Sequence, residues 1–533
     1  MGAIAIPRLP RPGGLRLTPP LVAVIVGGAL CLVYVLWTPF APDLAAQLAR
    51  ADLVRRAGNV WWWTGWFGGL SLPTYSLITP PMMAVFGVPV AGALLTVAAC
   101  WGAGVLASDT LRPRAGAVAF SLFAVADLVI GRVTFAIGLG FAVLALVALR
   151  ARSRVASAVL ALLCYLSSPL AALFLGFVLV ALVIVDRTRR TQAAVDAGLL
   201  VASVVATALL FPGPGLMHFG ATSVIAPGAG CALIAALCRP RVVRIVALLA
   251  LAALPLFMVY PTAVGSNVER LAWVAAVPVF VASAKLDVRK LAAAAIALSV
   301  WPAITFGVQV QWVPDPTTHA SYYDPLLREL KAARAAGGAA AIGERVEVLD
   351  PASHSGSLYL APSFAIARGW DRQADEANNP IFYGHRPLTA SAYDGWLRDL
   401  AVGWVAVPNT KLDYASRREA ELIEDGLPYL KLTWKSADWR LYQVRDPAPL
   451  ATGAAVTAVG PASVRLRVDG PASVLLRVRW TPYLRAQGPA DGVCIARDGH
   501  WSRISLPAAG TYSIVSSFDP TARFDPPDAT CAP

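Results

Sequence analysis

The stretch PLVAVIVGGALCLVYVLW, Pro20 to Trp37, is almost entirely apolar, and it approaches the length of about 20 residues that a helix needs to cross a membrane. Similar apolar runs recur up to about residue 310 and are separated by short linkers. Of the 533 residues, 57% are hydrophobic and only 14% are charged, which is too apolar for a soluble chain of this length. The sequence therefore predicts a polytopic α-helical membrane protein.

The predicted membrane domain covers residues 20–311 and contains about eleven transmembrane helices. We expect them near residues 20–38, 80–106, 115–130, 133–149, 155–168, 170–185, 195–211, 222–238, 242–260, 270–284 and 291–310. The helices of two pairs are joined by the tight turns Gly131-Arg132 and Ser167-Ser168-Pro169. Each pair is either two short helices or one long tilted helix, and two helices fit the alternation of charged linkers better.

The net charge of +13 comes largely from arginine and lysine in alternate linkers of the membrane domain. Such an asymmetry predicts that the N-terminus (residues 1–19) is cytoplasmic and that everything after residue 311 is extracytoplasmic. We expect the protein in the inner (plasma) membrane. Because orientation in the lipid bilayer accounts for the positive charge, we do not expect nucleic acid as a partner.

After Trp312 the composition becomes that of a water-soluble domain. Residues 312–446 combine the helical pattern DPLLRELKAARAAGG with the strand patterns RVEVL, GWVAVP and WRLYQV, which predicts a mixed α/β domain. Residues 447–533 alternate polar and apolar residues, as in SVRLRVDGPASVLLRVRW, which predicts a β-rich module, either a sandwich or barrel-like. Cys494 and Cys531 are candidates for a disulfide there.

The first outer loop, residues 39–79, brings acidic, basic and aromatic residues together next to the first span. We expect a helix from Pro42 to about Gly58. Its periodicity places Asp43, Gln47 and Arg50 on one face. On the opposite side, Asp52 is spaced to form an ion pair with Arg55 or Arg56.

Asp43 has two interpretations: a carboxylate that stabilises the N-terminus of a surface helix, or a general base at the mouth of a membrane cavity. Asp52 is the second catalytic candidate. The aromatic residues of the loop either anchor it at the membrane interface or form the floor of a groove for a sugar ring or lipid chain. These candidate substrate-binding residues are Trp61, Trp62, Trp63, Trp66 and Tyr75.

Several other polar residues are expected at the same end of the spans. Asp127 is an intramembrane acid, which is either paired with Arg132 or functional. Arg50, Arg132 and Arg270 are candidates to hold a lipid phosphate, and Arg270 is equally well explained as an interfacial residue. The remaining substrate-binding candidates are Gln47, His218, Asn267 and Glu269.

The chain resembles the GT-C superfamily of polytopic glycosyltransferases that use polyprenyl-phosphate sugars, and particularly the actinobacterial members. The resemblance covers about residues 20–310 and rests on the arrangement of the spans, an extracytoplasmic C-terminal domain and five short stretches. These stretches are APDLAAQL with Asp43, PTYSLITPP, GRVTFAIGLG, CYLSSPLAALFLG and YPTAVGSNVERL.

The resemblance implies that Asp43 is the catalytic base, that the donor is a lipid-linked sugar such as decaprenyl-phosphate mannose or arabinose, and that the acceptor is a cell-envelope glycan or glycolipid. Many relatives carry paired acids in the outer loops, whereas Leu44 follows Asp43 here. Whether a divalent metal, Mg²⁺ or Mn²⁺, is required is therefore left open. The alternatives are a carrier or flippase for a lipid-linked sugar or envelope lipid, and a non-catalytic envelope assembly protein.

Overall fold

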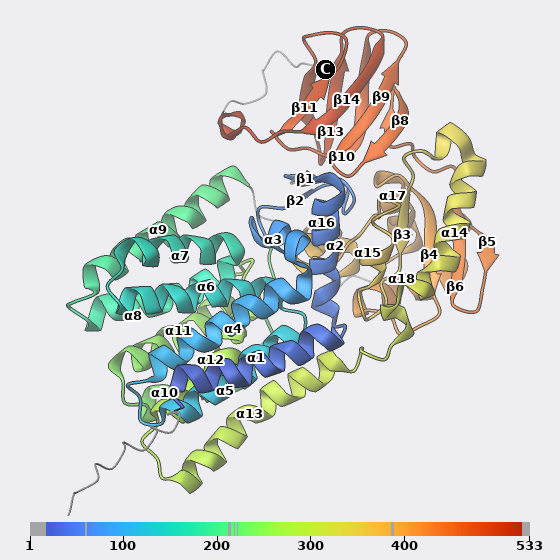
Figure 1. Cartoon of the computed structure of the whole chain (residues 1–533). Coiled ribbons are helices and arrows are strands. Elements are labelled where there is room, and N and C mark those ends of the chain that lie inside the picture. The colour runs from blue at the N-terminus through green and yellow to red at the C-terminus, as the bar shows by residue number, and fades with distance from the viewer. Residues whose placement is uncertain are drawn as a thin grey trace, which may run out of the picture.

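The computed structural model describes residues 17–58, 61–211, 215–217, 219–220, 222–384 and 388–524. The first part of the chain forms a bundle of helices, and the last part forms two smaller units that contain the longer strands (Figure 1). The first outer loop lies between the bundle and these two units. The protein is thus mostly helical with a β-rich C-terminal region.

Each segment expected to cross the membrane contains a helix. The helices of the bundle are α1 (Pro19–Trp37), α4 (Val88–Ala107), α5 (Pro113–Val129), α6 (Val133–Arg150), α7 (Arg154–Ser167), α8 (Pro169–Val185), α9 (Arg190–Leu210), α10 (Thr222–Leu237), α11 (Arg241–Val259), α12 (Arg270–Ser283) and α13 (Val288–Val310).

In the described chain, six of these helices are long and apolar enough to cross a membrane, namely α1, α4, α6, α9, α11 and α13. Helices α7 and α8 and most of α10 are apolar but shorter, and α5 and α12 have 17 and 14 residues. The six long helices indicate a membrane protein in a lipid bilayer. The total of eleven spans and the side on which each loop lies stay predictions.

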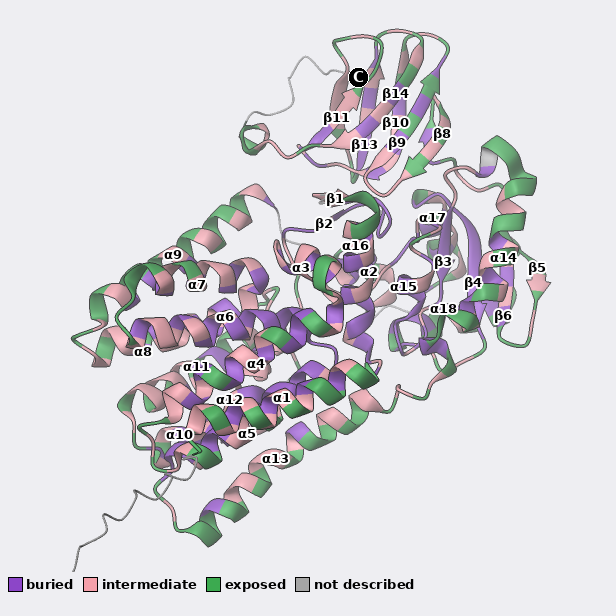
Figure 2. Cartoon of the chain, in the orientation of Figure 1, coloured by how far each residue is buried: buried purple, intermediate pink, exposed green. Residues whose placement is uncertain are grey.

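The outer surface of the bundle carries large apolar side chains that water would not favour. Val201 and Val205 on α9 and Ile296, Val300 and Ile304 on α13 are all exposed. Figure 2 shows that α9 and α13 carry mostly exposed and intermediate residues, whereas α6 is largely buried. A lipid environment would cover these apolar surfaces.

The two doubtful pairs of spans are separate helices. Between α5 and α6 the chain turns at Gly131, which has a φ of +86°. Between α7 and α8 it turns at Ser168, whose hydroxyl accepts a hydrogen bond from the Ala171 amide at the start of α8. A glycine in the left-handed region and a serine N-cap are residues that end and begin helices.

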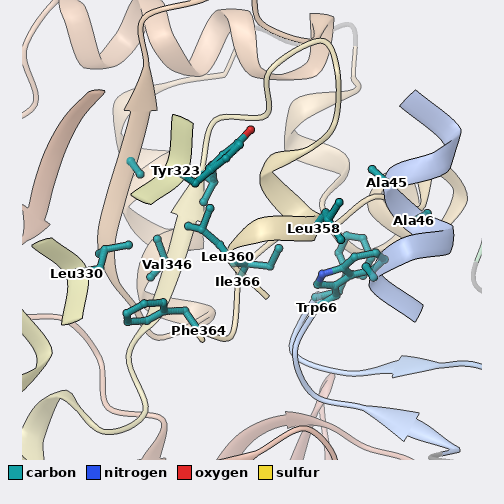
Figure 3. Close-up of a cluster of buried hydrophobic side chains, with 14 of the residues drawn as sticks. Ala45, Ala46, Trp66, Tyr323, Leu330, Val346, Leu358, Leu360, Phe364 and Ile366 are labelled. Atoms are coloured by element: carbon teal, nitrogen blue, oxygen red, sulfur yellow. The ribbon is translucent and has the colours of Figure 1, made fainter. Parts of the chain in front are cut away.

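The segment predicted to be the first outer loop contains α2 (Pro42–Ala57), β1 (Trp62–Trp63) and β2 (Leu70–Ser71). The span expected over residues 80–106 is divided at Gly87 into a short helix, α3 (Thr79–Phe86), and α4. The helix predicted to begin at Pro42 is confirmed, and Gly58 follows its last residue. Alanines of α2 and the indole of Trp66 pack with residues of the α/β unit such as Leu358, Leu360 and Ile366 in one apolar core (Figure 3). This core joins the loop to the C-terminal half of the chain.

The α/β unit is built on one sheet with the strand order β3-β4-β6-β5, in which β3 and β4 are parallel and the other pairs are antiparallel. Its elements are α14 (Ala320–Gly337), β3 (Arg345–Val348), α15 (Gly356–Tyr359), α16 (Arg372–Asn378), α17 (Ala390–Asp399), β4 (Val402–Pro408), α18 (Tyr414–Glu424), β5 (Leu430–Lys435) and β6 (Trp439–Val444). The predicted helix and all three predicted strands are present.

The last unit is a β-sandwich of two four-stranded sheets, ordered β12-β13-β10-β7 and β11-β14-β9-β8. Its strands are β7 (Ala451–Thr452), β8 (Ala455–Gly460), β9 (Ser463–Val468), β10 (Ala472–Arg479), β11 (Leu484–Gln487), β12 (Cys494–Asp498), β13 (Trp501–Leu506) and β14 (Gly510–Ser516). Val464, Leu466 and Val468 alternate with exposed residues and point into the core. Because β9 and β10 belong to different sheets, the DGP turn between them crosses the sandwich.

Cys494 at the start of β12 is disulfide-bonded. Its predicted partner Cys531 lies outside the described residues. The five other cysteines, all in the bundle, are free and buried, as expected for small apolar residues.

Candidate functional site

Asp43 lies in the first turn of α2, immediately after the chain leaves α1. Pro42 begins the helix, so the carboxylate is next to the free backbone amides of the helix N-terminus, which stabilise a negative charge. Its side chain is 36% exposed and does not line either of the cavities described below, so the membrane cavity expected beside it stays a prediction. The carboxylate of Asp43 is therefore partly accessible at the surface of the protein.

Arg270, the first residue of α12, faces this carboxylate. Its Nη2 atom lies 3.5 Å from Oδ2 of Asp43, too far for a good charge-assisted hydrogen bond but close enough for an ion pair. The Nε atom of Arg270 is buried and has no hydrogen-bond partner in the described chain. Arg270 thus retains unused donor capacity next to Asp43.

Glu269 precedes Arg270 in a 3₁₀ turn (η1, Gly265–Glu269) and forms no ion pair among the described residues. Burial raises the pKa of Glu269, and the positive charges of Arg132 and Arg270 act in the opposite direction. Both guanidinium groups therefore lie close enough to act on this carboxyl group. In the sequence, the YPTAVGSNVERL stretch places Glu269 next to Arg270, but it does not contain Arg132.

Arg132 is held in place from two sides. Its Nη1 atom donates a hydrogen bond of 3.0 Å to Oδ1 of Asp127, and its guanidinium lies over the ring of Trp273, 5.6 Å from the ring centre. The interpretation of Asp127 as the partner of Arg132 fits this geometry. The second carboxylate oxygen of Asp127 and the indole nitrogen of Trp273 are buried without a partner in the described chain.

The turn that carries Arg132 packs directly against the backbone of Asp43 and Leu44. A Cβ atom added to Gly131 would lie 2.6 Å from the backbone nitrogen of Leu44 and 3.2 Å from the carbonyl carbon of Asp43. Only a glycine fits this contact, and its φ of +86° is also unfavourable for other residues. Gly131 therefore brings Arg132 and Asp43 into one neighbourhood.

We expect Gly131→Ala to lower the free energy of unfolding by about 1–3 kcal/mol, because the added methyl group meets the backbone and the left-handed conformation is strained. The melting temperature of the purified protein in detergent would measure this. Gly28→Ala in α1 is the matched control, because nothing lies within 4 Å of its added Cβ. An equal melting temperature for Gly131→Ala and the wild type would contradict the packing of this turn.

Gln47 lies one turn after Asp43 on the same face of α2 and is buried. Its side-chain nitrogen donates to the hydroxyl of Tyr75 at 2.8 Å, and its oxygen accepts a hydrogen bond from Thr134 at the start of α6. Thr134 also lies 3.3 Å from the hydroxyl of Thr79. These bonds fix α2 to the bundle beside Asp43, so Gln47 and Tyr75 hold the loop in position.

Arg50, on the same face of α2, is engaged with the α/β unit. Its Nη2 atom donates to Oδ2 of Asp371 at 2.8 Å, and both side chains are almost fully buried, at 2% and 4% exposure. The guanidinium also lies over the ring of Tyr75 at 3.9 Å. Arg50 is thus a structural link between the loop and the α/β unit, and its partner in the structure is a buried carboxylate.

The tryptophans of the loop pack inside the protein. Trp63 and Trp66 are 1% and 0% exposed and belong to the core shared with the α/β unit. Trp62 packs against the core of the β-sandwich, and Trp61 stacks on Phe518 with ring centres 4.5 Å apart. These contacts give all four a packing role between the units.

The other candidates lie outside this cluster or have simple partners. Asp52 forms an exposed ion pair of 2.6 Å with Arg56 one turn later. The side-chain amide of Asn267 donates to the sulfur of Met217. His218 lies outside the described residues. Among the residues that the structure describes, no group of three or more histidine, cysteine and acidic side chains is arranged to hold a metal ion.

A second charged cluster, which the sequence did not reveal, lies inside the α/β unit. Arg368 pairs with Asp375 at 2.8 Å and lies 3.5 Å from Glu419 and 3.8 Å from Glu347. Both oxygens of Glu347 lack a hydrogen-bond partner in the described chain. Arg368 and Asp375 also line a cavity of 20 Å³, which is large enough for one water molecule. The sequence feature that could have indicated this cluster is Glu347 in RVEVL, because an acidic residue there interrupts the apolar residues of a buried strand.

Burial raises the pKa of Glu419 from its ordinary 4.5 to about 7, although Arg368 and the hydroxyl of Tyr393 favour the charged form. At a pH between these two pKa values, the carboxyl group of Glu419 is protonated in the folded protein and ionised in the unfolded chain. The free energy of unfolding therefore falls as the pH rises from about 5 to 7.5. We expect this decrease in the free energy of unfolding to be smaller by about 1–3 kcal/mol in Glu419→Gln than in the wild type. Denaturant unfolding at both pH values would measure it.

The control for this experiment is Glu421→Gln, which changes an exposed carboxylate on the same helix. It should leave the pH dependence as in the wild type, because an exposed group has a similar pKa in the folded and unfolded chains. A Glu419→Gln variant with an unchanged pH dependence would contradict the protonation of the buried glutamate.

No protein-family model matches the chain, and no curated protein matches it. The candidate site therefore rests on its own geometry. Asp43, Arg132, Glu269 and Arg270 come from α2, from the turn before α6, from η1 and from the start of α12, and these elements meet at the end of the bundle that faces the loop and the α/β unit (Figure 1). Carboxylates beside guanidinium groups can move a proton and bind an anion at the same place.

Proposed function

We propose that the protein is an integral membrane glycosyltransferase of the GT-C type that moves a sugar from a polyprenyl phosphate to a cell-envelope glycan or glycolipid on the outer face of the membrane. The observation that supports this most is the partly exposed carboxylate of Asp43 beside Arg270, with Arg132 in the adjoining turn. Transfer of a sugar from a lipid phosphate requires a base for the acceptor hydroxyl and cationic groups that bind the phosphate, both at the membrane surface.

In the proposed reaction, the carboxylate of Asp43 accepts the proton of an acceptor hydroxyl while the hydroxyl oxygen attacks the anomeric carbon of the donor. The bond between this carbon and the phosphate oxygen breaks, and the polyprenyl phosphate leaves with both bonding electrons. The attack from the opposite face inverts the anomeric carbon. A phosphate is a good leaving group, so one carboxylate is sufficient.

Arg132 and Arg270 would bind the phosphate and stabilise the charge that develops on it. The contact of 3.5 Å between Arg270 and Asp43 is loose, so an arriving phosphate can draw the guanidinium away. Asp43 is then free to accept a hydrogen bond from the acceptor. The partly buried carboxyl group of Glu269 would bind a sugar hydroxyl, and the unpartnered Nε of Arg270 would find a partner in the phosphate.

The test uses the purified full chain in proteoliposomes with a radiolabelled polyprenyl-phosphate sugar and an envelope-glycan acceptor. We expect labelled glycan to form on one face of the membrane. Movement of the labelled lipid across the membrane without transfer would instead identify a carrier. Binding of the glycan with neither transfer nor movement would identify a non-catalytic assembly protein.

A further inference from the structure

A cavity of 460 Å³ lies among the helices at the end of the bundle opposite Asp43. Its walls come from the last turns of α4, α6, α8 and α12 and from the first turns of α5 and α11. The arginine-rich linkers lie at this end, which the charge asymmetry assigns to the cytoplasm. The volume falls within the range of about 300–1,000 Å³ that is typical of ligand sites.

Small side chains create this space. Ala103 and Ala107 on α4 and Ala282 on α12 line it, together with larger apolar residues such as Phe120 and Leu182. At one side Gly116 allows α5 to approach α12, because its added Cβ would lie 2.5 Å from the Cβ of Ala282. Water gains few hydrogen bonds in such an apolar space, so an apolar chain is the better occupant.

The polar part of the lining comes from Arg150 and Arg189 together with Asp109, Thr110 and Ser283. Arg150 and Arg189 are 34% and 31% exposed, so both lie where the cavity meets the surface. Their carboxylate partners are Asp109, which is 79% exposed, and Asp186. The Nε atom of Arg189 is buried and has no hydrogen-bond partner in the described chain. A guanidinium donor without a partner beside an apolar cavity suits a phosphate group attached to an acyl chain.

From these observations we propose that the cavity is a binding site for an anionic phospholipid of the adjoining leaflet. An acyl chain would fill the space between α4, α6 and α12, and the headgroup phosphate would lie beside Arg150 and Arg189. This site is separate from the proposed transfer site, since Gly116 and Asp127 lie near opposite ends of α5. The proposal does not depend on the glycosyltransferase function.

The test measures the lipid that the purified full chain retains. Protein in mild detergent is mixed with phosphatidylglycerol or phosphatidylcholine, and native mass spectrometry counts the bound lipids. We expect about one tightly held phosphatidylglycerol, preferred about fivefold or more over phosphatidylcholine because of the arginines. Ala107→Phe and Ala103→Phe, which fill the cavity from α4, should each reduce this bound population at least tenfold.

Val205→Phe on α9 is the matched control, because it adds the same ring at a side chain that is already 51% exposed on the bundle surface. It should retain phosphatidylglycerol as the wild type does. The double variant Arg150→Gln/Arg189→Gln leaves the apolar walls intact and should lose the preference for the anionic lipid. The proposal fails if the cavity-filling variants hold as much lipid as Val205→Phe, or if the double variant keeps the preference.

Discussion

Replacing Asp43 by asparagine should reduce sugar transfer by about 10²–10⁴-fold, the range expected when a general base is removed. Asparagine has nearly the same shape and is also favourable near a helix N-terminus, so α2 should remain folded. The loss should therefore appear in the turnover rate while the melting temperature changes little. Initial rates with a radiolabelled polyprenyl-phosphate sugar would measure the effect.

Asp52→Asn is the matched control for this experiment. Asp52 lies on the same helix, and among the described residues its ion pair is the exposed one with Arg56. Such a pair contributes at most about 0.5 kcal/mol, so activity and stability should both stay close to the wild type. If Asp43→Asn transfers sugar at the normal rate, Asp43 is not the base. A strong loss in Glu269→Gln alone would then assign the proton transfer to Glu269.

The second large effect concerns the link between the loop and the α/β unit. Arg50→Met should lower the free energy of unfolding by about 3–5 kcal/mol, because it leaves the buried carboxylate of Asp371 without its partner. Asp371 also accepts a hydrogen bond from the Ala374 amide at the start of α16, so its charge is held in place. The melting temperature and limited proteolysis of the loop would measure the loss.

Two further variants distinguish a lost ion pair from lost packing. Arg50→Met/Asp371→Asn removes both charges and keeps a side chain that can cap α16, so it should be more stable than Arg50→Met alone. Arg56→Met removes the partner of an exposed pair and should cost no more than about 0.5 kcal/mol. A double variant that is as unstable as Arg50→Met would contradict the role of the ion pair.

The features that the sequence predicted well are those set by neighbouring residues. The spacing from Asp52 to Arg56 on a helix leads to their ion pair, and Asp127 reaches Arg132 across the turn that Gly131 makes. Pro42 and Gly58 mark the ends of α2 because one fits the first turn of a helix and the other follows its last turn. Local backbone geometry decides all of these.

The features that the sequence did not reveal depend on residues far apart in the chain. Arg50 and Asp371 are separated by 321 positions, and no local pattern shows that they meet. One signal was present, since alanines surround Gln47 and Arg50 in AAQLARA, and small apolar neighbours indicate a buried helix face. The tryptophans of the loop were equally compatible with a membrane interface and with a core, because both environments favour aromatic rings.

The most direct test of the proposed site is a cryo-EM structure of the Asp43→Asn variant with its polyprenyl-phosphate sugar donor, because a slow variant retains the unreacted donor. We predict that the phosphate binds beside Arg132 and Arg270, with the anomeric carbon of the sugar facing residue 43. A donor phosphate bound at Arg150 and Arg189, at the other end of the bundle, would contradict the assignment of the transfer site.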